Sequence, residues 1–251
     1  VQEAHEMFKN AISSLQITPE MEIVAQSATG VFTYRSHHHN CECKNAMKLI
    51  SDTILYAPLL YMLAVVRDVG LYKQWIPFVH DSCLLSNHND DWGKVDFWCH
   101  FLPPFSLGYS QRDVCLSFQV FDCLGEEKPC VLLVGKNMRN PTVTVKMRDK
   151  KTERMTFCQY VIRLCPISAT SVHVTVATCT CPTLQFTPRP VEEWVAQQLL
   201  SDFLSEWGDL ATHVQRVRMQ REGKNDPHVK SLERDPKFTE FMEQRLSTTV
   251  Y

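Results

Sequence analysis

The chain has 251 residues, of which 44% are hydrophobic and 22% charged, and its formal net charge at pH 7 is −2. Such a chain can bury a sizeable core, and its near-neutral charge excludes a globally basic surface of the kind that binds nucleic acid. No apolar run reaches the roughly 20 residues that a membrane-spanning helix needs. The first residues include neither an initiator Met nor an apolar signal segment, which fits a processed chain or a domain of a longer polypeptide.

Eleven cysteines are many for this length, and their number is odd. Most lie in strand-like runs beside Val, Phe and Leu, at irregular spacings that fit no small disulfide scaffold. We therefore expect thiols that pack as small hydrophobic side chains in a reducing, cytoplasmic compartment.

The first third of the chain predicts a helix, then strands, then two short helices. The expected elements are a helix over 1–16, a long strand or bulged pair over Met21–Arg35, a strand over Ala46–Leu55, and helices over Tyr56–Val69 and Leu71–Val79. Two short helices inserted between strands are a distinctive arrangement.

A series of strand candidates follows, separated by turn signals rich in Asn, Asp, Pro and Gly. They are Ser82–Asn87, Lys94–Leu102, Arg112–Leu124, Pro129–Asn137, Thr142–Arg148, Met155–Pro166 and Thr170–Cys181. Alternation is clearest where Val172, Val174 and Val176 share one face. The pattern predicts an antiparallel meander with one face covered by a helix.

The segment Pro190–Arg216 supplies that helix. Its apolar residues recur at helical spacing and include Phe203 and Trp207. At roughly 1.5 Å per residue it is about 40 Å long, enough to cross a sheet. We predict an α+β chain in which a curved antiparallel sheet wraps around a long C-terminal helix.

Beyond Arg216 the composition becomes strongly charged. We therefore divide the chain into a domain over residues 1–216 and a charged, partly helical extension over residues 217–251, with a candidate last helix that carries Phe238, Phe241, Met242 and Leu246. The basic residues of the extension could dock on an anionic membrane, although a solvated helix end is the favoured interpretation.

Three local strings sharpen this picture. Trp75 and Pro77 stand near the end of the short helix pair, Arg112-Asp113 opens a strand after a Pro-rich turn, and Pro188–Trp207 follows a strand and a proline-bearing loop. In this order they resemble START domains, the StAR-related lipid transfer domains of the helix-grip superfamily.

The resemblance implies a non-enzymatic protein that encloses one phospholipid, sterol or sphingolipid between sheet and helix, and transfers it between membranes or senses it. It implies a lipid ligand, transient contact with a membrane surface, a location peripheral to membranes, no nucleic acid and no cofactor. The side chains expected to contact the lipid are Trp98, His100, Arg112, Phe118, Phe121, Val174, Leu199, Phe203 and Trp207.

One position departs from the family pattern. Several START relatives carry a second Arg six positions beyond the Arg of the Arg-Asp pair, and here that position is Phe118. A buried Arg that holds a phosphate is therefore replaced by an aromatic ring, which favours a less charged headgroup.

Two other functions stay open. One is a helix-grip enzyme, such as a cyclase, with Asp96, His100 and His173 as its acid and base groups. The other is a protein-interaction module with a collapsed cavity. The cluster from His37 to Cys43 contains zinc-ligand residue types, but its spacing fits no standard zinc site, so no metal is expected.

Overall fold

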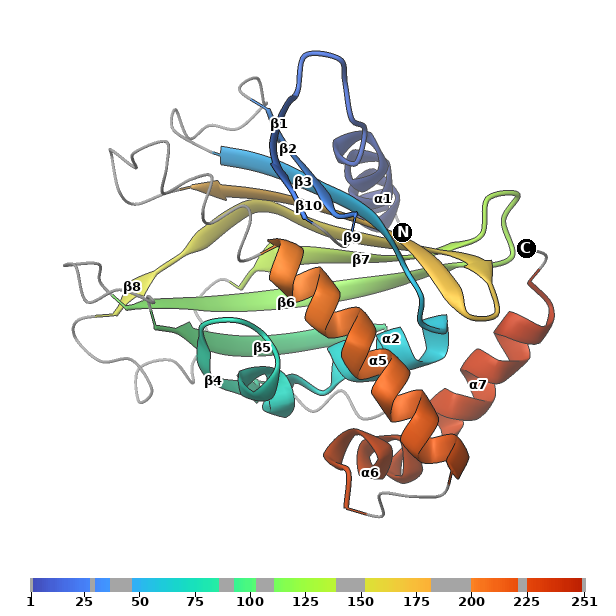
Figure 1. The fold of residues 1–251 in the computed structure, drawn as a ribbon. Coiled ribbons are helices and arrows are strands. Elements are labelled where there is room, and N and C mark those ends of the chain that lie inside the picture. The colour runs from blue at the N-terminus through green and yellow to red at the C-terminus, as the bar shows by residue number, and fades with distance from the viewer. Residues whose placement is uncertain are drawn as a thin grey trace.

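A computed structural model describes most of the chain (Figure 1). The described residues are 2–27, 30–36, 47–85, 93–102, 111–138, 152–181, 200–220 and 225–249. They form one large, mostly antiparallel sheet and several helices, which confirms the predicted α+β class. Several predicted features lie wholly or partly outside the described residues, among them the His37–Cys43 cluster, the strand Thr142–Arg148, the end of the strand Ser82–Asn87, Leu199 and the first part of the helix Pro190–Arg216.

The elements follow the predicted order. The strands are β1 Glu22–Gln26, β2 Phe32–Ser36, β3 Met47–Leu55, β4 Val79–Leu84, β5 Lys94–Phe101, β6 Arg112–Cys123, β7 Cys130–Asn137, β8 Glu153–Arg154, β9 Thr156–Ser168 and β10 Ser171–Cys181. The helices are α1 Gln2–Ser14, α2 Leu59–Arg67, the 3-10 helix η1 Val69–Gln74, α5 Phe203–Gln220, α6 Pro227–Arg234 and α7 Pro236–Ser247. The predicted bulged pair at Met21–Arg35 is the hairpin β1–β2, whose register shifts between Ile23 and Ala25.

The sheet has two faces with different covers. Its strand order is β1-β2-β3-β10-β9-β7-β6-β5-β4, with the short β8 beside β6. The inner face carries the large core and is crossed by α5, whereas α1 packs on the outer face against a smaller cluster that includes Ile50, Leu132 and Val161 (Figure 1). Strand alternation therefore decides which side chains can meet α5.

The second short helix differs from the prediction. The sequence predicts a helix over Leu71–Val79, but the structure has a 3-10 helix over Val69–Gln74 and a strand that already begins at Val79. Pro77 explains the early end, because it disfavours helical geometry at Ile76 and has no N–H to donate. Phe78 then adopts a positive φ of 65°, which turns the chain sharply into β4.

The charged C-terminal segment folds into two helices that pack on α2 and α5 (Figure 1). The aspartates Asp226 and Asp235 each cap the helix whose first residue is a proline. The second of these helices, α7, contains the residues of the predicted last helix, whereas α6 was not predicted. The boundary predicted at residue 216 falls inside α5, and the division of the chain into two parts stays a prediction.

The cysteines only partly match expectation. In the described part of the chain, seven cysteines carry thiols in strands, as predicted. Cys158 is disulfide-bonded, which contradicts the expectation of thiols throughout. As for membranes, none of the helices in the described ranges combines the length and apolarity that a bilayer crossing requires.

Candidate functional site

A cavity of about 250 Å³ lies between the inner face of the sheet and the helices α2, α5 and α7. Its apolar lining consists of Leu49, Leu63, Val66, Ile76, Val79, Val95, Phe97, Phe101, Val114, Leu116, Phe118, Val120, Leu133, Met155, Phe157, Ile162, Leu200, Phe203 and Phe238. Its other lining residues are Arg67, Tyr72, Cys99, Tyr160, Thr178 and Thr180. Such a lining suits an apolar molecule with few polar atoms.

Strand alternation builds the floor of the cavity. The register of β5 against β6 places Val95 opposite Phe118, so that alternate residues of both strands face α5. On β5 the lining residues run from Val95 to Phe101 in steps of two, and on β6 from Val114 to Val120 in the same steps. The intervening residues face the outer side of the sheet.

Aromatic rings form the centre of this floor. The ring of Phe118 stacks on Phe97 with centroids 5.6 Å apart, and meets the edge of Tyr160 at 5.2 Å. Beneath them, β7 carries Gly135, where an added Cβ would lie only 3.1 Å from both Phe118 and Tyr160. The absence of a side chain at Gly135 therefore leaves room for the Phe118 ring and for the Cβ of Tyr160.

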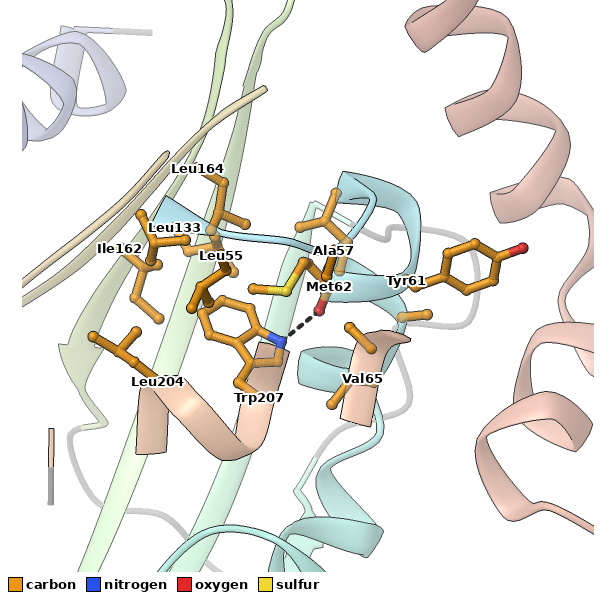
Figure 2. Close-up of a cluster of buried hydrophobic side chains, with 14 of the residues drawn as sticks. Leu55, Ala57, Tyr61, Met62, Val65, Leu133, Ile162, Leu164, Leu204 and Trp207 are labelled. Carbon is orange, nitrogen blue, oxygen red and sulfur yellow. Dashed lines mark hydrogen bonds between the residues drawn. The ribbon is translucent and has the colours of Figure 1, made fainter. Parts of the chain in front are cut away.

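The helix α5 closes the cavity from above with aromatic side chains. Phe203 lines the cavity, stacks on Trp75 with centroids 5.5 Å apart, and lies 5.6 Å from Trp207. Trp207 itself is fully buried between α5 and α2, among Leu55, Met62 and neighbouring side chains (Figure 2). The helix is thus held by its own core contacts, and Phe203 is the part of it that reaches the cavity.

Hydroxyl groups are the main polar feature of the sheet side. Tyr160 and Thr178 are direct neighbours on β9 and β10, and Thr180 lies two residues further along β10. Within the described chain, no hydrogen bond joins any of these three hydroxyls to another residue. Burial raises the pKa of Tyr160, so its hydroxyl stays protonated and can donate a hydrogen bond to a ligand.

The hydroxyl of Tyr72, in contrast, is already used. It donates to the backbone carbonyl of Val66, and burial raises its pKa well above the ordinary value. Tyr72 thus ties η1 to the end of α2 and presents its ring, rather than its hydroxyl, to the cavity.

One charged side chain, Arg67, stands at the end of the cavity near α7. Its guanidinium donates to the carboxylate of Asp235 at 2.8 Å and lies 3.9 Å above the centroid of the Phe238 ring. Burial alone would raise the pKa of Asp235, but the hydrogen bonds from Arg67 and from the backbone N–H of Phe238 bring it below its usual value. The charge of Arg67 is therefore already balanced within the protein.

The structure places only part of the predicted contact set around the cavity. Phe118 and Phe203 line it. Val174 and Trp207 are fully buried in the same core but do not line it, and Leu199 lies outside the described residues.

The remaining predicted contacts face elsewhere. Trp98 points to the outer face and donates its indole N–H to Asp113 at 3.1 Å, next to His100. Phe121 also lies on the outer face, with its ring 5.9 Å from Phe8 of α1. Arg112 does not line the cavity and forms an ion pair with Glu153 at the start of β6, where β8 pairs with it.

Two residues with clear roles in the lining were missed. Phe97, rather than its neighbour Trp98, shares a face with Phe118. The sequence shows both aromatic residues but not which of them faces the cavity. Phe238 lies in the helix predicted for the extension, which the prediction did not connect with the lipid site, although the ring lines the cavity. The acid and base groups considered for an enzyme, namely Asp96, His100 and His173, do not line the cavity.

Comparison with solved structures identifies the fold. Human StAR-related lipid transfer protein 5 matches with a TM-score of 0.68 at 12% identity, over 85% of this chain and 97% of that chain. Human STARD10 matches with a TM-score of 0.67 at 11% identity, over 85% of this chain and 81% of that chain. A STAR-related lipid transfer protein from Xanthomonas axonopodis matches with a TM-score of 0.59 at 18% identity, over 76% of this chain and 98% of that chain.

At the level of sequence, no protein-family model and no curated protein matches the chain. Identities this low establish a shared architecture and leave function to be argued from the site. The chain has the helix-grip fold of the START lipid transfer structures, as its motif order predicted.

Proposed function

We propose that this chain binds one lipid with an uncharged headgroup in the cavity between sheet and α5, without catalysing a reaction, and carries it between membranes or senses it. The observation that carries the proposal is the composition of the lining. Among the described residues, Arg67 is the one charged group in the lining, and Asp235 already pairs with it. A ligand that brought its own charge into this cavity would lose hydration without gaining a counter-ion.

Burial of hydrocarbon supplies the affinity. Each CH₂ group removed from water contributes about 0.8 kcal/mol, so a single acyl chain or fused-ring system gains enough to be extracted from solution. Transfer of the lipid also requires transient contact with a membrane surface, which supplies and accepts it.

The hydroxyls of Tyr160, Thr178 and Thr180 support an uncharged polar group on the ligand. They lie together on β9 and β10 and line the cavity. A sterol hydroxyl or an ester carbonyl could exchange hydrogen bonds with them, and an apolar chain could then extend toward Phe97 and Phe203. Similarity to lipid transfer structures adds support from the fold.

Native mass spectrometry of protein purified from lipid-rich cells tests the proposal. We expect one added mass per chain, which denaturing extraction resolves into a neutral lipid class. A protein that arrives empty and extracts nothing from liposomes would contradict lipid binding. A bound anionic phospholipid would instead contradict the uncharged headgroup.

A cavity-filling variant assigns the site. Val114 is 2% exposed and lines the cavity, so Val114→Phe places the added ring in the empty volume and should remove most of the bound lipid. Ile54→Phe is the matched control, because Ile54 is 47% exposed and lies on the outer face opposite His173. Equal lipid occupancy in the two variants would place the lipid elsewhere.

A further inference from the structure

Three cysteines and a histidine occupy one row across the outer face of the sheet. Cys123 of β6 pairs with Cys130 of β7, and Cys165 of β9 pairs with His173 of β10. The register of β7 against β9 pairs Val131 with Leu164, which brings Cys130 next to Cys165. Side chains that are directly opposite on antiparallel strands lie on the same face, about 4.5–5.5 Å apart at Cβ.

The two central thiols are unequal. Hydrogen bonding between the two thiols lowers the pKa of Cys165 and raises that of Cys130. Burial opposes this shift at Cys165, whereas the nearby positive charges of Arg163 and His173 add to it. Cys165 is thus the group that ionises first, with Cys130 as its hydrogen-bond donor.

The positive charge beside Cys165 is held in place by a carboxylate. His173 hydrogen-bonds through Nε2 to Asp52 at 3.0 Å, and this bond raises the pKa of the imidazole. Asp52 also accepts a hydrogen bond from Thr175 at 2.8 Å, and Thr175 in turn accepts one from Arg163 at 3.3 Å. The carboxylate itself works against ionisation of Cys165, but more weakly than Cys130, Arg163 and His173 favour it.

Three other thiols have no such neighbours in the strand register. Burial raises the pKa of Cys83, Cys99 and Cys179, so each behaves as a small hydrophobic side chain. Cys83, like Cys165, is partly exposed, but it stands opposite Trp98 in its strand pair. Exposure alone therefore does not distinguish Cys165; its neighbours do.

We propose that Cys165 and Cys130 form a peroxide-reactive dithiol on the outer face of the sheet, a modification site separate from the cavity. Cys165 is partly exposed and Cys130 is buried behind it, so a small hydroperoxide can reach Cys165 first. The described residues contain no group of three or more His, Cys, Asp or Glu side chains that could hold a metal ion.

The reaction has two steps. In the first, the Cys165 thiolate attacks one oxygen of hydrogen peroxide; an S–O bond forms, the O–O bond breaks, and the departing hydroxide takes a proton from solvent to become water. In the second, the Cys130 sulfur attacks the sulfur of the Cys165 sulfenic acid; the S–S bond forms, the S–O bond breaks, and the leaving hydroxide takes the Cys130 proton. Two thiols and one peroxide thus yield one disulfide and two waters.

Peptide mapping after peroxide treatment tests the pair. The reduced full chain is treated with stoichiometric hydrogen peroxide, alkylated, and cleaved without reduction. Cleavage after Glu127 separates Cys123 from Cys130, so a Cys130–Cys165 link can be told from a Cys123–Cys130 link. We expect the Cys130–Cys165 link to form; a link between Cys123 and Cys130 would overturn the assignment.

Two substitutions separate the roles of the thiols. In Cys165→Ser the rate of peroxide consumption should fall about tenfold or more, whereas in Cys130→Ser a sulfenic acid should accumulate on Cys165 and be trapped by dimedone. Cys83→Ser is the control with comparable exposure and should react like the unmodified chain. An unchanged rate in Cys165→Ser would overturn the proposal, and circular dichroism of each variant establishes that the sheet has formed.

Discussion

The indole N–H of Trp207 donates a hydrogen bond to the backbone carbonyl of Met62, 2.9 Å away (Figure 2). This bond joins α5 to α2 at a point where both partners are fully buried. The carbonyl belongs to the helix that borders the cavity, so the bond fixes the position of α5 without involving a ligand.

Replacing Trp207 by Phe should destabilise the chain by about 2 kcal/mol, because it leaves a small void and a buried carbonyl without its side-chain partner. Trp75→Phe is the matched control: Trp75 also stacks on Phe203, but within the described chain its buried indole N–H has no hydrogen-bond partner. That substitution should cost less than about 1 kcal/mol. Urea unfolding followed by circular dichroism measures both, and equal costs would argue against a role for the Met62 bond.

Tyr160→Phe should weaken lipid binding while leaving the fold intact. The hydroxyl has no partner among the described residues, so its removal costs the protein no hydrogen bond of its own. If it bonds to the ligand, affinity should fall by a factor of about 2 to 12, which corresponds to about 0.5–1.5 kcal/mol. Titration with a fluorescent lipid measures the change. Unchanged affinity would remove Tyr160 from the headgroup contacts.

Phe238→Ala should change ligand binding through the end wall of the cavity. The ring lines the cavity under the guanidinium of Arg67, so its loss enlarges the space and exposes that charge. Phe241→Ala is the control on the same helix, because Phe241 packs against the core but does not line the cavity.

Both variants should lose stability, by about 2–5 kcal/mol for the buried Phe238 and less for the partly buried Phe241. Only Phe238→Ala should alter the lipids recovered by extraction. The same lipid profile in the two variants would show that α7 does not shape the site.

His173→Gln should lower stability in a pH-dependent way. The hydrogen bond to Asp52 raises the pKa of His173 above its ordinary value, so its contribution is complete below that value and disappears as the pH rises through the raised pKa. Asp52 has a lowered pKa: burial opposes this, and the bonds from His173 and Thr175 outweigh it, so the carboxylate remains charged in weak acid. The substitution should therefore cost more at about pH 5.5 than at about pH 8.5.

The cost should stay below about 1 kcal/mol, because the imidazole is 33% exposed and solvent screens the pair. Thermal melts at the two pH values measure it. His100→Gln is the control, since His100 bonds to the amide of Gln111 rather than to a carboxylate. A difference in melting temperature that does not depend on pH would contradict the role assigned to the ion pair.

The sequence was sufficient for the order of elements but not for the orientation of individual side chains. Long segments such as β6 and α5 can be predicted from the sequence, because many of their apolar residues follow one period. Which neighbour faces inward depends on the register between strands, and the choice of Trp98 over Phe97 could only be settled once Val95 was seen to pair with Phe118.

Two further features were set by tertiary contacts. The sequence predicts the helix that carries Phe238, but only the packing of that helix on α2 brings the ring to the cavity. The Cys130–Cys165 pair joins residues from different strands, so no local spacing revealed it.

The lack of a side chain at Gly135 helps to set the depth of the cavity. A ring can lean across a strand only where that strand carries no Cβ, and both Phe118 and Tyr160 lie against this one position. A single methyl group added here would lift the aromatic floor toward α5 and make the binding space shallower, although it would lie beneath that floor and touch no ligand. A substitution at Gly135 would thus change the volume available to a lipid. Lipid selectivity can therefore change through a residue that does not line the cavity and that a comparison of ligand contacts would omit.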